Sequence, residues 1–164
     1  MNVELTYKKI LVPLDFSDTS RKAFYVALKY ARVFNADTVA LHVNDVGRSV
    51  DEMEKSAAEL ARLEEGVERR LNELWADGGL DEVDRRRVTV EVRGGKPWIE
   101  IVKTADDLNC DLIVMGTHGT TGLKHMLIGS QAERVVRRAN CHVLTIKPDG
   151  FNNNLDSIPG KFKV

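Results

Sequence analysis

The sequence predicts a single α/β domain in which five parallel strands alternate with four helices. Short apolar runs of strand length alternate with longer segments whose apolar residues recur at every third or fourth position. Glycine, proline and polar residues separate these segments. The chain has 164 residues, of which 43% are hydrophobic, and this is enough for one domain with its own core. This alternation predicts a doubly wound parallel sheet of strand order 3-2-1-4-5, with helices on both faces.

The first predicted strand and helix lie near the amino terminus. Ile10–Leu14 is apolar on both faces, so we expect a central strand, and Asp15 follows its carboxyl end. Ser17 or Asp18 can cap the following helix. The apolar positions of this helix form one broad face: Ala23, Phe24, Ala27, Leu28, Ala31 and Phe34.

A second strand and a long surface helix follow. The strand is Thr38–Val43, and we interpret His42 within it as a packed core residue, since no second histidine lies at metal-ligand spacing. The helix is expected over Val50–Trp75, ending before Gly78. Asp81–Arg87 mixes both signs of charge and is predicted to be a solvated loop.

The next segments predict an edge strand and an amphipathic helix. Val88–Val92 alternates apolar and polar residues, as a strand with one wetter face does. Pro97 suits the first turn of a helix, which continues to Leu108. The last strand is expected over Cys141–Ile146, where Pro148 then ends the pattern.

Between the helix that ends at Leu108 and the last strand, the pattern predicts a buried strand, a glycine-rich loop and a helix. The strand Leu112–Met115 runs into Gly116, and Gly119, Gly129 and Ser130 precede a helical pattern. Glycines permit a positive φ and a close approach of the backbone to a ligand. The amino terminus of a helix offers unpaired N–H groups and positive potential. The stretch therefore predicts a phosphate-binding loop.

A purely structural interpretation of the same loop stays open. Ser130 and Glu133 form a capping-box pattern, so the serine hydroxyl could serve only its own helix, and the glycines could serve only a turn. The loop is not a P-loop, because G-x-x-x-x-G-K-[ST] does not occur in the chain. It is not a dinucleotide fingerprint either, because G-x-G-x-x-G is missing.

The loop resembles the G-x-x-G-x9-G-[ST] signature of the universal stress protein family. Gly116, Gly119, Gly129 and Ser130 match this signature at the family spacing, and Lys9–Ser17 also resembles the family. The resemblance runs from about residue 8 to residue 148. It implies a nucleotide-binding domain over residues 1–148, which leaves residues 149–164 as a tail. The tail has no apolar period, and we expect it to be flexible.

The expected strand order brings two distant loops together. The order reverses between the first and fourth strands, where sheets of this kind bind ligands beyond the strand carboxyl ends. In ATP-binding members of the family, the residues that match Asp15 and Val43 hold the adenosine end, and the glycines and Ser130 hold the phosphates. The resemblance thus implies a site for ATP, or for ADP or AMP, with Mg²⁺ bound through the phosphates. The predicted nucleotide-binding residues are Pro13, Leu14, Asp15, Val43, Met115, Gly116, Thr117, His118, Gly119, Gly129, Ser130 and Gln131.

Composition excludes several other classes. A net charge of −1 gives no electrostatic basis for nucleic-acid binding. No signal peptide and no apolar stretch of spanning length is apparent, so we expect a cytoplasmic protein without a membrane partner. Two cysteines, Cys110 and Cys141, flank apolar strands and are expected to be lone buried thiols.

The preferred functional hypothesis is an ATP-binding, nucleotide-dependent regulator of the stress response, with an unknown protein partner. No general base, Walker aspartate or metal cluster is evident in the sequence, so no catalytic residue is predicted and any hydrolysis is expected to be slow. The alternatives are a slow ATP-hydrolysing or autophosphorylating enzyme and, less favoured, a receiver-type phosphoacceptor domain. The last strand, Cys141–Ile146, would be a sheet edge, and we expect a homodimer through it. Members of the family commonly pair in this way.

Overall fold

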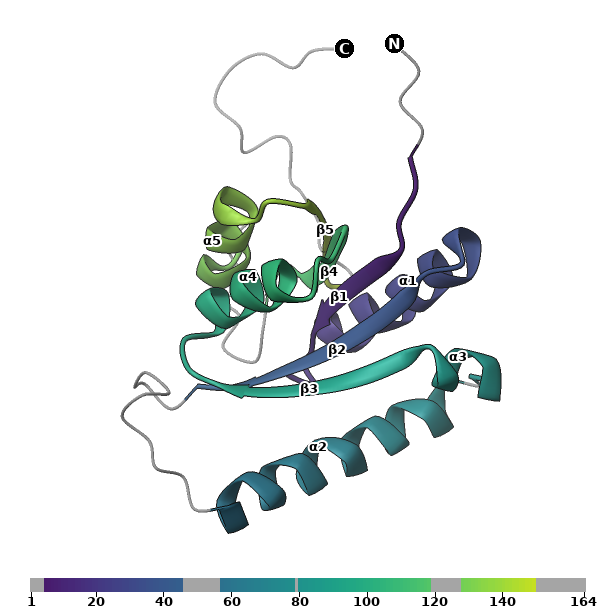
Figure 1. The fold of residues 1–164 in the computed structure, drawn as a ribbon, viewed down its shortest axis with the longest axis vertical. Helices are drawn as coiled ribbons and strands as arrows, with labels where there is room; N and C mark the ends of the chain where they lie inside the picture. Colours follow the sequence, from purple (N-terminus) through teal and green to yellow (C-terminus); the bar gives the residue numbers. More distant parts are fainter. Residues whose placement is uncertain (1–4, 46–56, 79, 119–127, 150–164) are drawn as a thin grey trace.

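The structure is a computed structural model, and it describes residues 5–45, 57–78, 80–118 and 128–149. Its centre is a five-stranded parallel sheet of order β3-β2-β1-β4-β5, which confirms the predicted fold class and strand order (Figure 1). The strands are β1 (Lys9–Pro13), β2 (Asp37–Asn44), β3 (Val88–Gly94), β4 (Leu112–Gly116) and β5 (His142–Ile146).

The helices are α1 (Asp18–Phe34), α2 (Ala57–Asp77), α3 (Glu82–Arg86), α4 (Pro97–Asp107) and α5 (Ser130–Arg138). Ser17 caps α1 by accepting a hydrogen bond from the Ser20 N–H, and Pro97 lies in the first turn of α4, both as predicted. The predicted start of the long helix at Val50 lies outside the described residues. The prediction of a solvated loop over residues 81–87 is wrong, because α3 occupies most of it.

Two apolar cores lie on opposite faces of the sheet. On one face, Phe24 and Leu28 of α1 pack with Leu74 of α2 against the sheet. On the other face, the core contains Ile101 of α4 and Val135 of α5. Figure 1 shows α4 and α5 side by side on this second face. The central strand β1 is buried from Ile10 to Val12, so the sheet is covered on both faces as a parallel sheet requires.

Both cysteines are free thiols, as predicted, with Cys110 buried and Cys141 partly buried. Burial, reinforced by the neighbouring Cys141, raises the pKa of Cys110 to about 11. Cys110 is therefore protonated at neutral pH, and an unreactive packing role follows. Among the helices in the described part of the chain, none is long and apolar enough to cross a membrane.

A salt bridge between α1 and α3 explains why the charged segment folds as a helix. Asp84 is buried, and its Oδ1 accepts a hydrogen bond of 2.7 Å from Arg32 Nε, while its Oδ2 contacts a second Arg32 nitrogen. Asp81 caps α3 through the Asp84 N–H at 3.0 Å. The hydrogen bond from Arg32 is the main cause that lowers the pKa of Asp84. Non-local partners in α1 thus stabilise α3, and the local charge pattern does not show them.

We predict that Asp84→Asn lowers the free energy of unfolding at pH 7, because it removes the ionic half of this contact. Because the pKa of Asp84 is lower in the folded state, its ionised form stabilises the protein at pH values above the unfolded-state pKa of about 3.9. This stabilisation is lost as the pH falls through the folded-state pKa. The difference between wild type and Asp84→Asn should therefore shrink below about pH 4. Urea unfolding from pH 7 to pH 3 measures it, with Glu68→Gln on the exposed face of α2 as control. A difference in free energy of unfolding that did not change with pH would contradict a stabilising ion pair between Arg32 and Asp84.

Candidate functional site

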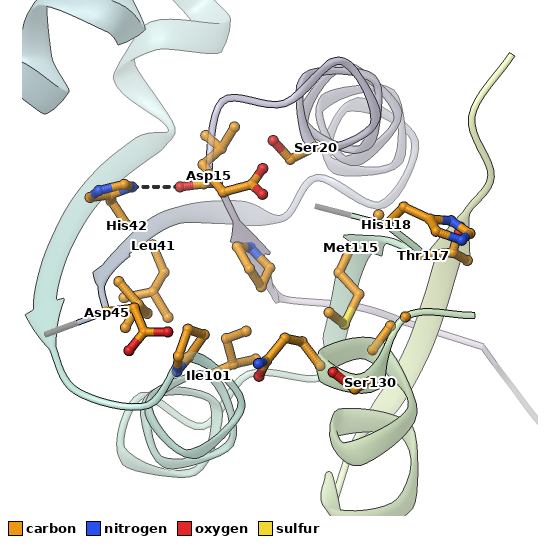
Figure 2. A pocket seen from close by; sticks show the side chains of 18 of the residues that line it. Asp15, Ser20, Leu41, His42, Asp45, Ile101, Met115, Thr117, His118 and Ser130 are labelled. Atoms are coloured by element: carbon orange, nitrogen blue, oxygen red, sulfur yellow. Dashed lines mark hydrogen bonds between the residues drawn. The ribbon is translucent and has the colours of Figure 1, made fainter. Parts of the chain in front are cut away.

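A pocket of about 510 Å³ opens at the carboxyl ends of β1, β2 and β4 (Figure 2). Its volume lies in the usual range for small-molecule sites, about 300–1,000 Å³. All the predicted site residues except Gly119 line it, and Gly119 lies outside the described residues. These lining residues are Pro13, Leu14, Asp15, Val43, Met115, Gly116, Thr117, His118, Gly129, Ser130 and Gln131.

The topology of the sheet opens this space. From β1, the chain continues through α1 to β2 on one side, whereas β4 lies on the other side and leads through α5 to β5. The connecting helices therefore leave in opposite directions, and a crevice remains between the end of β1 and the end of β4. The predicted convergence of Asp15 with the glycine loop is thus a feature of the pocket.

The end of β2 presents backbone groups to the pocket. Pairing of β1 with β2 ends at Pro13↔Leu41, with one further hydrogen bond from Leu14 N to Leu41 O at 2.8 Å. Residues two apart in a strand point their N–H and C=O groups to the same side. Val43 therefore directs its N–H and C=O toward the side where β1 has already ended. This donor and acceptor pair resembles the free edge of a strand, positioned at a ligand site.

The turn from β1 into α1 supplies polar groups on the opposite wall. Asp15 Oδ1 accepts hydrogen bonds from Ser17 N at 3.0 Å and Ser17 Oγ at 2.6 Å, which orients the carboxylate. Ser20 is buried and lines the pocket beside Asp15, and its Oγ donates to Ser17 O at 3.0 Å. Asp15 is therefore both a turn residue and a residue that lines the pocket.

Gly116 and Gly129 are needed for space, and this differs from the conformational reason expected for Gly116. In the described residues, the only glycine with a positive φ is Gly95. A Cβ on Gly116 would lie 2.9 Å from Thr19 Cγ2, and a Cβ on Gly129 would lie 2.8 Å from Thr117 O. Gly129 N also donates to Thr117 O at 2.7 Å, which closes the loop at its base. The glycines thus let the loop ends and α1 approach closely.

Ser130 does not cap α5. The N-cap is Gly129, with extended backbone angles of φ −72° and ψ 153°, and no side chain makes a capping hydrogen bond there. Ser130 is the first residue of the helix and is exposed at the pocket. The capping-box interpretation is therefore wrong. The first N–H groups of a helix have no partner within it, so the start of α5 directs hydrogen-bond donors and a hydroxyl at the pocket.

Sequence reasoning did not include several other lining residues. His42 and Asn44 flank Val43, and Asp45 follows β2 directly, so their place at the end of this strand could have indicated them. The approach of the α4 amino terminus comes from tertiary packing, which carries no local signal. The additional residues are Ser20, Leu41, His42, Asn44, Asp45, Pro97, Ile101 and Ala132.

The fold and the pocket together define a doubly wound α/β domain with a pocket at its topological switch point. Residues 6–147 match the family model described as the universal stress protein family, and the chain belongs to that family.

Named relatives support the assignment. The universal stress protein MJ0531 of Methanocaldococcus jannaschii is 38% identical over 151 residues, covering 89% of this chain and 85% of the relative. MJ0577 of the same organism is 32% identical over 162 residues, covering 88% of this chain and 98% of the relative. Its solved structure aligns at a TM-score of 0.65, with 33% identity, over 89% of this chain and 99% of that one. The universal stress protein UspA from Lactobacillus plantarum aligns at a TM-score of 0.63, with 28% identity, over 87% and 99% of the two chains.

We predict that Gly116→Ala destabilises the protein by about 1–3 kcal/mol, because the new methyl group overpacks the space beside Thr19 Cγ2. Thr19→Ser removes that Cγ2 and keeps the hydroxyl. The double variant should therefore lose less stability than the two single variants together, by about 0.5 kcal/mol or more. Urea unfolding of the four proteins measures this coupling. If the losses in free energy of unfolding were strictly additive, the contact with Thr19 of α1 would not be the reason that position 116 requires glycine.

Proposed function

We propose that this universal stress protein binds ATP in the pocket at the switch point and acts as a nucleotide-dependent regulator. The observation that carries the proposal is the pairing of two backbone sites across the pocket. The amino terminus of α5 lies at the end of β4, and the outward backbone of Val43 lies at the end of β2. The first suits an anion, and the second suits a base with adjacent donor and acceptor atoms.

The phosphates would lie against the Gly116–Ser130 loop. Gly116 and Gly129 line the pocket there, and the start of α5 adds N–H donors and positive potential. The hydroxyls of Thr117 and Ser130 are additional donors. Mg²⁺ would be held mainly through phosphate oxygens, as is usual for this ion.

The adenine would lie at the Val43 end. Adenine offers an acceptor at N1 beside a donor at N6, and Val43 offers a donor N–H beside an acceptor C=O. Parallel strands are spaced about 4.8 Å apart, so β2 and β4, separated by β1, are about 10 Å apart. That separation suits a nucleotide that spans the reversal point, with Asp15 from the turn after β1 facing the nucleoside.

The regulatory role follows from the chemistry of the donors. Backbone N–H groups and hydroxyls hold a triphosphate in place, whereas fast hydrolysis needs a positioned group that activates water. We therefore propose that nucleotide occupancy alters the binding of a protein partner. The alternative activity, slow hydrolysis or autophosphorylation, is decided by incubation with ATP labelled at the γ-phosphate. Free labelled phosphate indicates hydrolysis, and label retained on the protein indicates autophosphorylation.

We predict that nucleotide-free protein gains thermal stability with ATP and magnesium. At one hundred times the dissociation constant, binding contributes about 2.7 kcal/mol, which for this size corresponds to roughly 5–11 °C in Tm. Ser130→Ala should reduce the ATP-induced shift and change the stability of the free protein by less than about 0.5 kcal/mol, because Ser130 is not a cap.

Ser130→Pro extends this test to the backbone. Proline suits the first helical position, and the extended Gly129 before it is compatible with a following proline. This variant removes the N–H as well as the hydroxyl, so its shift should be smaller than that of Ser130→Ala. Thr89→Ala, which removes an exposed hydroxyl on β3, is the control. The site would be wrongly placed if Ser130→Pro folded normally and kept the full ATP shift, and absence of any wild-type shift would end the nucleotide proposal.

We also propose a homodimer through β5. This strand is the sheet edge beside β4, and its other side faces away from the sheet. His142 N donates to Asp111 O, and Ile146 O accepts from Thr117 N, so residues of even number between them face β4. Val143 and Thr145 therefore direct their backbone groups outward, where a second copy can pair.

Thr145→Pro tests the dimer with little disturbance of the domain. The substitution removes an outward N–H and keeps the hydrogen bonds to β4. An edge strand accepts proline at a position of this kind. We expect wild type to sediment as a dimer at micromolar concentration and Thr145→Pro to sediment as a monomer with its circular dichroism spectrum preserved. A monomeric wild type at high micromolar concentration would contradict the proposal.

A further inference from the structure

His42 bonds to the carbonyl at which β1 leaves the sheet. Its Nδ1 lies 2.7 Å from the Leu14 carbonyl oxygen, and Figure 2 marks this hydrogen bond with a dashed line. A carbonyl only accepts, so Nδ1 carries the proton and donates it. The ring is half-buried at the pocket wall. The predicted role of a merely packed core residue therefore does not describe His42.

This hydrogen bond lies where the next bond of the sheet would form. After Leu14 N–H donates to Leu41 C=O, regular parallel pairing continues with a hydrogen bond from Val43 N–H to Leu14 C=O. In the described residues, however, the ladder ends at Pro13↔Leu41, and the imidazole of His42 donates to the Leu14 carbonyl. A side chain thus donates to the carbonyl that would accept from the Val43 N–H if the ladder continued.

The chain beyond Leu14 is held in an uncommon conformation. Phe16 has a φ of 63°, a left-handed conformation that a residue with a large side chain rarely adopts. Its ring centroid lies 5.5 Å from that of His42, and its carbonyl accepts from Arg21 Nε at 3.1 Å. Arg70 of α2 lies over the same ring, 5.2 Å from its centroid. Contacts from α1, α2 and β2 therefore hold the turn in this conformation.

We infer that His42 is a positioning residue that ends the β1–β2 ladder one step early and so reserves the Val43 N–H and C=O for the nucleotide base. This inference rests on the proposed ATP site and deepens it. His42 would determine base preference without contacting the base through its own Nδ1. The phosphate end of the pocket, on β4 and α5, is served by other elements and does not depend on it.

Base chemistry gives the inference a specific readout. Adenine has an acceptor beside a donor amine at its Watson–Crick edge, whereas guanine has a donor beside a carbonyl acceptor. The Val43 backbone fits the first pattern and opposes the second. If Val43 N–H instead bonds to Leu14 C=O, preference for adenine should fall and affinity for the phosphates should remain.

The experiment compares binding of ATP, GTP and tripolyphosphate by calorimetry to full-length wild type, His42→Phe and His42→Asn. His42→Phe keeps a ring against Phe16 and removes the donor, while asparagine can place an amide N–H near the position of Nδ1. His142→Phe is the matched control, since it removes another histidine whose Nδ1 bonds to an oxygen, Tyr7 Oη at 3.1 Å. His142 begins β5, at the end of the sheet away from the pocket.

We expect His42→Phe to lose about tenfold in ATP-over-GTP preference, which corresponds to about 1.4 kcal/mol. Its affinity for tripolyphosphate should stay within about twofold of the wild-type value, because distant and independent sites influence each other by no more than that. His42→Asn should retain most of the preference, and His142→Phe should retain all of it. An unchanged preference in His42→Phe, or equal loss of ATP and tripolyphosphate binding, would overturn the inference. Failure of wild type to bind ATP would instead refute the proposed function.

A measurement on wild type applies even if His42→Phe does not fold. The Val43 amide should exchange its hydrogen faster than the Leu41 amide in nucleotide-free protein, because it makes no ladder hydrogen bond to Leu14 C=O. ATP should slow exchange at Val43, and tripolyphosphate should not. Protection of Val43 without nucleotide would show that the ladder continues and would overturn the inference.

Discussion

The early departure of β1 from the sheet is the constraint on which the site depends. A fully paired central strand would leave its neighbours no exposed backbone, but β1 ends level with Leu41 and β2 continues to Asn44. On the other side, β4 runs on to Gly116 and leads by the glycine loop to α5. The central strand therefore stops before both of its neighbours and leaves a space between their carboxyl ends. The turn into α1 lines one side of this space through Asp15, and the starts of α4 and α5 also line it.

Hydroxyl groups of Ser20, Thr117 and Ser130 line this space, together with carboxylate, amide and imidazole side chains. Gly129 brings the loop end within 2.7 Å of Thr117 O, and Ser130 begins a helix directly after it. Such an arrangement presents donors without moving and without a large entropic cost on binding. It suits recognition of a nucleotide more than its rapid conversion. A regulator that responds to nucleotide occupancy needs a site of this kind, with affinity supplied by geometry.

Much of this arrangement was predictable from sequence because it follows from local pattern and topology. Strand runs, helix periods and the strand order required the end of β1 and the glycine loop to converge. The reasons for individual residues were less predictable. Glycine at 116 is required by the Thr19 methyl group on another element, and Ser130 lies one position inside the helix, past the cap that its motif suggested. Likewise, α3 depends on Arg32, about fifty positions away, and the role of His42 depends on where β1 stops.

The most direct test of the central claim is a titration of ¹⁵N-labelled protein followed by amide chemical shifts. If the nucleotide spans the switch point as proposed, adenosine should perturb the Val43 amide and leave Ser130 nearly unchanged. Tripolyphosphate should perturb Ser130 and leave Val43 nearly unchanged, and ATP should perturb both at one common dissociation constant. Perturbation by ATP confined to other parts of the sheet, or saturation of Val43 and Ser130 at different ATP concentrations, would contradict the account.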